Sequence, residues 1–156
     1  MIGFVVALER EGKYVLSLIE NKQEIIIAGK KCVLGTILKK EAVIIFSGIG
    51  KVSAAIATQA IIDAFSPSVI VNFGSAGGVK DKVEVLKYYQ ISSCCQYDFD
   101  LTKIDDVPLG YIQDYDCNFF DAKTLNVFLP IAKLATADRF LATEQDIESV
   151  LSLKCD

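Results

Sequence analysis

Three short segments of the chain, residues 2–8, 42–46 and 69–73, are apolar without the alternation of polar positions that a half-exposed strand shows. They are also rich in β-branched side chains, which favour strands. A continuous apolar run is typical of a strand that is covered on both faces, as in the parallel sheets of α/β proteins. The pattern therefore predicts a sheet with helices packed around it.

The segments between these runs predict a hairpin and two helices. Residues 24–28 and 31–38 are typical of antiparallel strands that turn at residues 29–30, with more polar character on one side. This hairpin makes the predicted sheet mixed rather than purely parallel. Helices are predicted over residues 11–20 and 52–65, and the second ends shortly before a proline, because the residue preceding proline disfavours helical backbone.

The second half of the chain gives weaker signals. Residues 83–102 predict one long strand or two short ones, residues 104–118 predict a loop, and residues 131–136 predict another strand. Thr143, followed by Asp146 three residues later, resembles a capping box that opens a helix with one apolar face, Ile147, Val150 and Leu151. Together the elements predict an α/β fold with a central mixed β-sheet flanked by helices.

The length of 156 residues predicts a single domain over residues 1–156. The chain is 52% hydrophobic, with a mean hydropathy of +0.39. No apolar run approaches the roughly 20 residues of a membrane span, so the apolar excess is expected in a core or an oligomer interface. No basic and apolar leader follows Met1, and we expect a cytoplasmic protein without a membrane partner.

Composition limits the chemistry. The chain has no histidine, which excludes Ser-His-Asp and Cys-His catalysis and leaves carboxylates as the natural acid–base groups. A net charge of −4 argues against nucleic acid as a partner and favours a small substrate. The cysteines lack Cys-x-x-Cys spacing and are expected to be reduced thiols, mostly structural: Cys32, Cys94, Cys95, Cys117 and Cys155.

Two glycine-rich turns follow predicted strands. SGIGKVSAA, residues 47–55, matches neither a complete dinucleotide fingerprint nor a Walker A motif, and alone it predicts an ordinary strand-to-helix turn. VNFGSAGGV, residues 71–79, places Ser75 among three glycines, which would let a ligand approach the backbone closely. Ligands in open α/β sheets bind beyond the carboxyl ends of strands, so both turns are expected to border one crevice.

Two glutamates follow the first predicted strand. Acidic side chains at a helix N-terminus suit the helix dipole, and this is the preferred reading of Glu9. Glu11 is the candidate base. If the three apolar strands are parallel, Glu11, Ile49 and Ser75 lie around one opening, where a carboxylate could orient a water molecule.

Other candidates have plain structural explanations. Asp98 and Asp100 are predicted on one side of a strand end, but no further oxygen ligands cluster with them, and we expect no metal site. Composition alone favours a core position for Phe140 over a ligand platform.

Five motifs, taken in order, resemble the 5′-methylthioadenosine/S-adenosylhomocysteine nucleosidases of the purine nucleoside phosphorylase superfamily: ALERE, SGIGKVSAA, FGSAGG, YDFDLT and ADRFL. The resemblance implies an α/β fold with a central mixed sheet, assembled as a homodimer. It also implies hydrolysis of the bond between adenine and ribose in a nucleoside substrate, which releases adenine and a 5-thioribose product. No cofactor is implied.

The resemblance assigns roles to residues at the matching positions. Glu11 matches the glutamate that activates water, and Ser75, with its neighbours Ala76 and Gly77, matches the loop beside the ribose and base. Ile49 matches an apolar residue near the sugar. Leu8 stands where many members have a methionine against the ribose. In the later motifs, Phe140 matches the aromatic ring that stacks on adenine. Leu141 matches the residue whose main chain contacts the purine edge, and Leu101 matches an apolar residue that lines the 5′-thio pocket.

The resemblance also implies a departure. In the family, a Met-Glu pair that binds the ribose hydroxyls and an aspartate that protonates the purine lie beyond the region that matches residues 1–156. We therefore expect either a C-terminally truncated or divergent member, whose activity could be impaired, or the N-terminal part of a protein whose remainder is elsewhere. Alternatives are a purine nucleoside phosphorylase, a nucleosidase for another purine compound such as futalosine, or an inactive nucleoside-binding or dimerisation protein. The first is disfavoured because the chain has only two arginines, Arg10 and Arg139, to bind phosphate.

Overall fold

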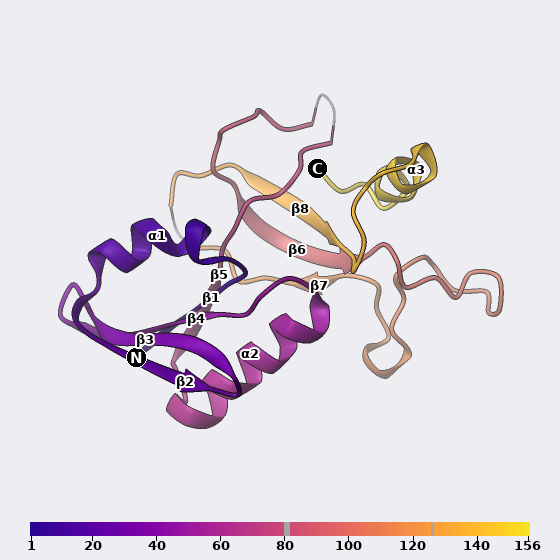
Figure 1. The fold of residues 1–156 in the computed structure, drawn as a ribbon. Coiled ribbons are helices and arrows are strands. Elements are labelled where there is room, and N and C mark those ends of the chain that lie inside the picture. The colour runs from indigo at the N-terminus through magenta and orange to yellow at the C-terminus, as the bar shows by residue number, and fades with distance from the viewer. Residues whose placement is uncertain (80–81, 126) are drawn as a thin grey trace. The chain divides into compact units, whose positions relative to one another are not determined.

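The computed structural model describes residues 1–79, 82–125 and 127–156 (Figure 1). The chain forms two compact units, Met1–Ala76 and Gly77–Asp156, and each is described by itself. Whether they act as the single domain expected above stays a prediction. In the described residues, no helix combines the length and the apolar character needed to cross a membrane.

The first unit contains a five-stranded mixed sheet in the order β2-β3-β4-β1-β5 (Figure 1). The strands β4, β1 and β5 are parallel, whereas β2, β3 and β4 are antiparallel. This confirms both the three parallel strands and the hairpin. The elements are β1 (Ile2–Val6), α1 (Glu9–Leu18), β2 (Glu20–Ile27), β3 (Lys30–Ile37), β4 (Lys40–Phe46), α2 (Lys51–Phe65) and β5 (Val69–Asn72).

The two helices cover opposite faces of this sheet. Ala57 and Ile61 of α2 pack on one face with Ile45, whereas Val15 and Leu16 of α1 lie against the apolar cluster on the other face. The apolar run of β4 is buried from Ala42 through Phe46, as its uninterrupted pattern predicts. β5 lies at the end of the sheet with β1 as its neighbour, so Val69 remains 39% exposed although its run is equally apolar.

Several boundaries differ from the prediction, including the start of the first helix at Glu9 rather than residue 11, the end of that helix, and the turn of the hairpin. The helix predicted to reach residue 20 ends at Leu18, because Ile19 adopts an extended backbone and enters the core, and β2 begins at Glu20. The hairpin turns at Ala28 and Gly29, one residue earlier than expected, with both residues in the left-handed region.

The second unit contains a three-stranded sheet in the order β7-β6-β8, in which β6 and β8 are parallel. Its elements are β6 (Gln90–Gln96), η1 (Gln113–Tyr115), β7 (Phe120–Asp121), β8 (Ile131–Thr136) and α3 (Glu144–Ser152). The strand predicted over residues 131–136 is confirmed. The predicted strand over residues 83–102 is limited to β6, and residues 104–118 form loops around η1. The mixed α/β class is confirmed, with the strands divided between two sheets.

The helix α3 begins as predicted but buries a different face. Thr143 Oγ1 accepts from Asp146 N at 3.2 Å, and Asp146 Oδ2 accepts from Thr143 N at 3.1 Å, which confirms the capping box. Val150 packs in the core of this unit, but Ile147 is 48% exposed. Leu151 is exposed as well, because the helix turns Asp146, Val150 and the following Leu153 inward.

Candidate active site

The parallel strands of the first unit end at one edge of the sheet. Val6 pairs with Phe46 and Val5 pairs with Asn72, so the three strands end side by side. Residues 7–11, 47–50 and 73–76 follow directly. The strand register therefore places the segments that carry Glu11, Ile49 and Ser75 at one edge of the sheet, and the shared opening expected for these three residues stays a prediction.

Glu11 and Ser75 are in direct contact at this edge. The Ser75 hydroxyl donates to Glu11 Oε1 at 2.5 Å, and the Ser75 backbone N–H donates to the same oxygen at 3.0 Å. The other carboxylate oxygen, Oε2, accepts from the backbone N–H of Leu8 at 3.2 Å. The carboxylate is thus held by three donors in the first turn of α1, where the helix dipole also favours a negative charge.

The surroundings of Glu11 keep it ionised. Partial burial raises the pKa of the Glu11 carboxyl, but the hydrogen bonds from Ser75 and Leu8 and the charge of Arg10 outweigh it. The pKa therefore lies below its ordinary value of 4.5. At neutral pH Glu11 is an acceptor of protons and can serve as a general base, but not as an acid.

The glycines around this edge serve two different purposes. Gly48 and Gly50 have φ of 79° and 103°, so the turn between β4 and α2 requires them for its backbone shape. Gly74 has no such φ. A Cβ built on Gly74 would lie 3.4 Å from Glu11 Oε1, so its absence leaves the carboxylate open on that side.

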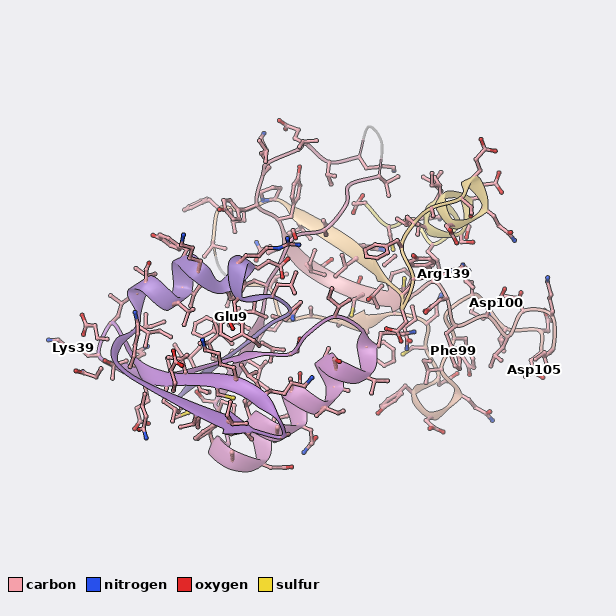
Figure 2. All side chains as sticks on the ribbon, in the orientation of Figure 1. Glu9, Lys39, Phe99, Asp100, Asp105 and Arg139 are labelled. Carbon is pink, nitrogen blue, oxygen red and sulfur yellow. The ribbon has the colours of Figure 1, made fainter. Side chains whose placement is uncertain are left out.

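Apolar and polar neighbours complete the edge. Ile49 is 69% exposed between the two glycines, and Leu8 is half-buried at the start of α1. Lys30, which sequence reasoning did not single out, donates from Nζ to the Ser47 carbonyl at 2.5 Å and braces this turn. Glu9, labelled in Figure 2, is exposed and lies 3.3 Å from Lys31 Nζ, in agreement with the structural role expected for it.

The remaining predicted residues belong to the second unit. Phe140 is 85% exposed and Leu141 is 45% exposed, in the segment that joins β8 to α3. The core position that composition favours for Phe140 is therefore wrong. Leu101 is half-buried in the turn after β6, and Gly77 is exposed, as is Ala76 at the end of the first unit.

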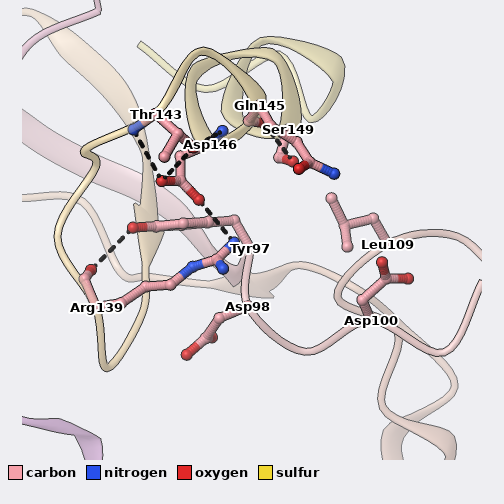
Figure 3. Close-up of a pocket in the computed structure, with 9 residues that line it drawn as sticks. All are labelled: Tyr97, Asp98, Asp100, Leu109, Arg139, Thr143, Gln145, Asp146 and Ser149. Carbon is pink, nitrogen blue, oxygen red and sulfur yellow. Dashed lines mark hydrogen bonds and ion pairs between the residues drawn. The ribbon is translucent and has the colours of Figure 1, made fainter.

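A polar cavity of about 350 Å³ lies beside this segment in the second unit (Figure 3). Arg139 pairs with Asp146 at 2.8 Å, and the Tyr97 hydroxyl donates to the Arg139 carbonyl at 2.9 Å. Asp98 and Asp100 line the cavity but lie beyond β6, not within a strand as expected. No group of three metal-ligating side chains occurs in the part of the chain that the structure describes.

Comparisons with known proteins identify the family of the chain. The profile of the Phosphorylase superfamily matches residues 1–143. The 5′-methylthioadenosine/S-adenosylhomocysteine nucleosidase of Shewanella halifaxensis is 32% identical over 155 residues, which cover 99% of this chain and 63% of the relative. The chain thus spans less than two thirds of the length of that relative.

Solved nucleosidases have the same fold. The Streptococcus pneumoniae enzyme, solved with a transition-state inhibitor, is 27% identical with a TM-score of 0.83, over 97% of this chain and 70% of that one. The Colwellia psychrerythraea enzyme, solved with adenine, is 25% identical with a TM-score of 0.87, over 99% and 69%. These matches confirm the resemblance that the sequence motifs indicate, and the chain belongs to the Phosphorylase superfamily.

Proposed function

We propose that the protein hydrolyses the N-glycosidic bond of 5′-methylthioadenosine or S-adenosylhomocysteine and releases adenine and a 5-thioribose product. The observation that carries the proposal is the ionised Glu11 carboxylate, held by Ser75 and Leu8 at the carboxyl ends of parallel strands. The nucleosidases named above support the choice of substrate, as does the adenine in one of their structures.

The reaction needs a negative charge and a base on the ribose side of the bond. Departure of adenine leaves an oxocarbenium-like ribose, which a nearby carboxylate stabilises. In the proposed step Glu11 takes a proton from water while the water oxygen bonds to the anomeric carbon. The electron pair of the broken C–N bond leaves with adenine, which must gain a proton. No residue of this chain is assigned as that acid; the reaction balances through solvent, which takes the proton that Glu11 gained from water and supplies the one that adenine gains.

The binding roles follow the motif matches. Ser75, Ala76 and Gly77 are proposed beside the ribose and base, where small side chains let the backbone approach the substrate. Ile49 and Leu8 are proposed to give the sugar an apolar surface that limits access of bulk water. In the second unit, Phe140 is proposed to stack on adenine and Leu141 to bind the edge of the base through its main chain. Leu101 is proposed to line the 5′-thio pocket.

The test is adenine release from 5′-methylthioadenosine by the purified chain, with and without phosphate, alongside calorimetric titration with adenine. Release that does not depend on phosphate supports the proposal. Release that requires phosphate would assign the chain to the phosphorylases instead. Adenine binding without release would mean that these residues hold the base and that the proton donor is not among them. The absence of both adenine binding and adenine release would contradict the proposal.

We also propose that the protein is a homodimer in the cytoplasm. Val52 and Ile56 lie one turn apart on α2 and are 69% and 46% exposed, which suits a surface that a second copy covers. The unpaired thiols, among them the buried Cys32, suit a reducing compartment. Light scattering on the purified chain and on Val52→Lys tests the assembly, with a dimeric mass expected only for the unsubstituted chain.

A further inference from the structure

The segment between β8 and α3 is fastened on both sides of Phe140 and Leu141. Before them, Asp98 Oδ2 accepts from the Asp138 backbone N–H at 2.9 Å, and the Tyr97 hydroxyl donates to the Arg139 carbonyl at 2.9 Å. After them, Asp146 Oδ2 accepts from the backbone N–H groups of Ala142 and Thr143 at 3.3 and 3.1 Å. Four backbone groups of residues 138–143 are therefore held by three side chains, Tyr97, Asp98 and Asp146.

The two residues between these anchors are left open. Within the residues that the structure describes, no hydrogen bond engages the backbone of Phe140 or Leu141. Their side chains are also exposed, with Phe140 at 85%. An exposed aromatic face next to an unused N–H and C=O matches what a planar nitrogen heterocycle needs, which is a stacking surface and a partner for its edge.

The anchoring side chains are themselves rigid. Tyr97 is 4% exposed and Asp146 is 5% exposed, so neither can rotate freely. Arg139, labelled in Figure 2, lies over the Tyr97 ring at 5.6 Å and pairs with Asp146, which joins the anchors on the two sides (Figure 3). Only part of this network serves the helix. Capping α3 requires Thr143 and Asp146, but not the bond from Tyr97 to the Arg139 carbonyl.

We propose that Tyr97, Asp98 and Asp146 are positioning residues that hold the backbone around Phe140 and Leu141 in the shape that receives the purine. The inference rests on the proposed function, which gives those two residues their contact with adenine. A segment fixed before the ligand arrives loses less conformational entropy on binding, so the anchors favour binding without touching the base. Tyr97 and Asp98 lie in the YDFDLT motif and Asp146 lies in α3, but the motif matches assign none of them a contact with the substrate.

The test separates order in the segment from binding of the base. Because the chain contains no tryptophan, Phe140→Trp introduces a single indole whose fluorescence anisotropy reports local mobility. In that background, Tyr97→Phe, Asp98→Ala and Asp146→Ala, where alanine, unlike asparagine, keeps no side-chain acceptor, are compared with Tyr111→Phe. The last is a matched control, since Tyr111 also loses a hydroxyl that is hydrogen-bonded, to Asp116 at 2.7 Å, in another loop of the same unit.

Binding is measured with Phe140 intact, by calorimetric titration with adenine. Each anchor variant is expected to bind adenine about 3- to 10-fold more weakly, as the loss of one hydrogen bond predicts, and to show lower anisotropy in the indole background. Tyr111→Phe is expected to change neither. If the chain turns over methylthioadenosine, KM should rise more than kcat falls, because the contacts to the purine exist before the bond breaks.

Two outcomes would overturn the inference. Unchanged adenine affinity and anisotropy in Tyr97→Phe and Asp98→Ala, each of which removes an anchoring hydrogen bond, would show that the anchors do not position the segment. If the unsubstituted chain binds no adenine, both the proposed function and the positioning role fail. Lower anisotropy in the variants would then identify the anchors as purely structural. The positioning role can also fail alone: hydrolysis that Glu11→Gln stops, together with anchor variants that bind adenine as tightly as the unsubstituted chain, would remove the positioning role and leave the proposed function in place.

Discussion

Ser75 gives two hydrogen bonds to one oxygen of Glu11, at 2.5 Å from its hydroxyl and 3.0 Å from its backbone, although 64 residues separate them in the chain. The bonds tie the loop after β5 to the first turn of α1. Because Leu8 holds the other oxygen, the plane of the carboxylate is fixed relative to the sheet edge. A base with a fixed orientation can align a water molecule for attack, which a freely rotating side chain cannot do as well.

Replacement of Glu11 by glutamine should remove hydrolysis. The amide keeps the size of the side chain and one acceptor oxygen but cannot take a proton from water, so the rate should fall by about 10²–10⁴-fold. Glu9→Gln is the matched control, because Glu9 is exposed and forms an ion pair with Lys31 at the surface of the first unit. Adenine release by both variants is the measurement. Activity retained in Glu11→Gln would remove the proposed mechanism.

The acid limb of the activity should lie below pH 4.5. Since the pKa of Glu11 is below its ordinary value of 4.5, the carboxylate stays ionised as the pH falls and is protonated only below that value. The stability that this ionised group contributes is likewise present above the ordinary pKa and lost as the pH falls through the lowered one. The acid limb is measured as kcat/KM, obtained from initial rates at a series of pH values, with circular dichroism to exclude unfolding.

Ser75→Ala should move that limb upward. The substitution removes the hydroxyl donor and leaves the backbone N–H in place, so part of the stabilisation of the carboxylate is lost and the pKa of Glu11 rises toward 4.5. Ser17→Ala, on the exposed side of α1, is a control that should leave the limb in place. A limb that is the same in Ser75→Ala would mean that the hydroxyl does not interact with the ionised base.

Gly74→Ala should reduce activity without unfolding the protein. The added methyl would lie 3.4 Å from Glu11 Oε1, an ordinary contact that the backbone tolerates, but it would cover the side of the carboxylate that is open. We expect at least about a tenfold loss of rate, since misplacement or exclusion of the water affects the reacting geometry directly.

Gly29→Ala provides the opposite case. Gly29 has φ of 71° and open space around it, so alanine there should cost about 1 kcal/mol of unfolding free energy through backbone strain and leave activity unchanged. Denaturant unfolding and adenine release on both variants separate the two effects. A Gly74→Ala protein that is as active as the unsubstituted chain would contradict the open side proposed for the carboxylate.

Local patterns predicted much of this structure. The apolar runs gave β1 and β4, and Thr143 with Asp146 marked the start of α3, because these signals depend on residues close in sequence. The placement of Glu11 and Ser75 at one edge of the sheet could be predicted for a different reason. Parallel strands end at one edge, so residues that follow them can be placed together without knowledge of the packing.

Structural features that depend on contacts between residues far apart in the sequence could not be predicted from local patterns. Asp146 is buried because Arg139 neutralises it, so a hydrophobicity pattern that treats every carboxylate as exposed assigns the wrong face to α3 and buries Ile147. The contact of the Tyr97 hydroxyl with the Arg139 carbonyl spans 42 residues and leaves no trace in local composition. The end of α1 was missed because Ile19 continues the apolar pattern while leaving the helix for the core.

The thiols of Cys95 and Cys155 should resist alkylation in the folded protein. Their sulfur atoms lie 3.6 Å apart in the core of the second unit, and burial raises the pKa of Cys95 to about 12. The Cys95 thiol is then almost entirely protonated at pH 7, and the thiolate is the reactive form. Iodoacetamide labelling followed by peptide mass spectrometry should modify the half-buried Cys94 and Cys117 first, and the buried thiols only after denaturant is added. Rapid labelling of Cys95 without denaturant would show that this core opens under native conditions.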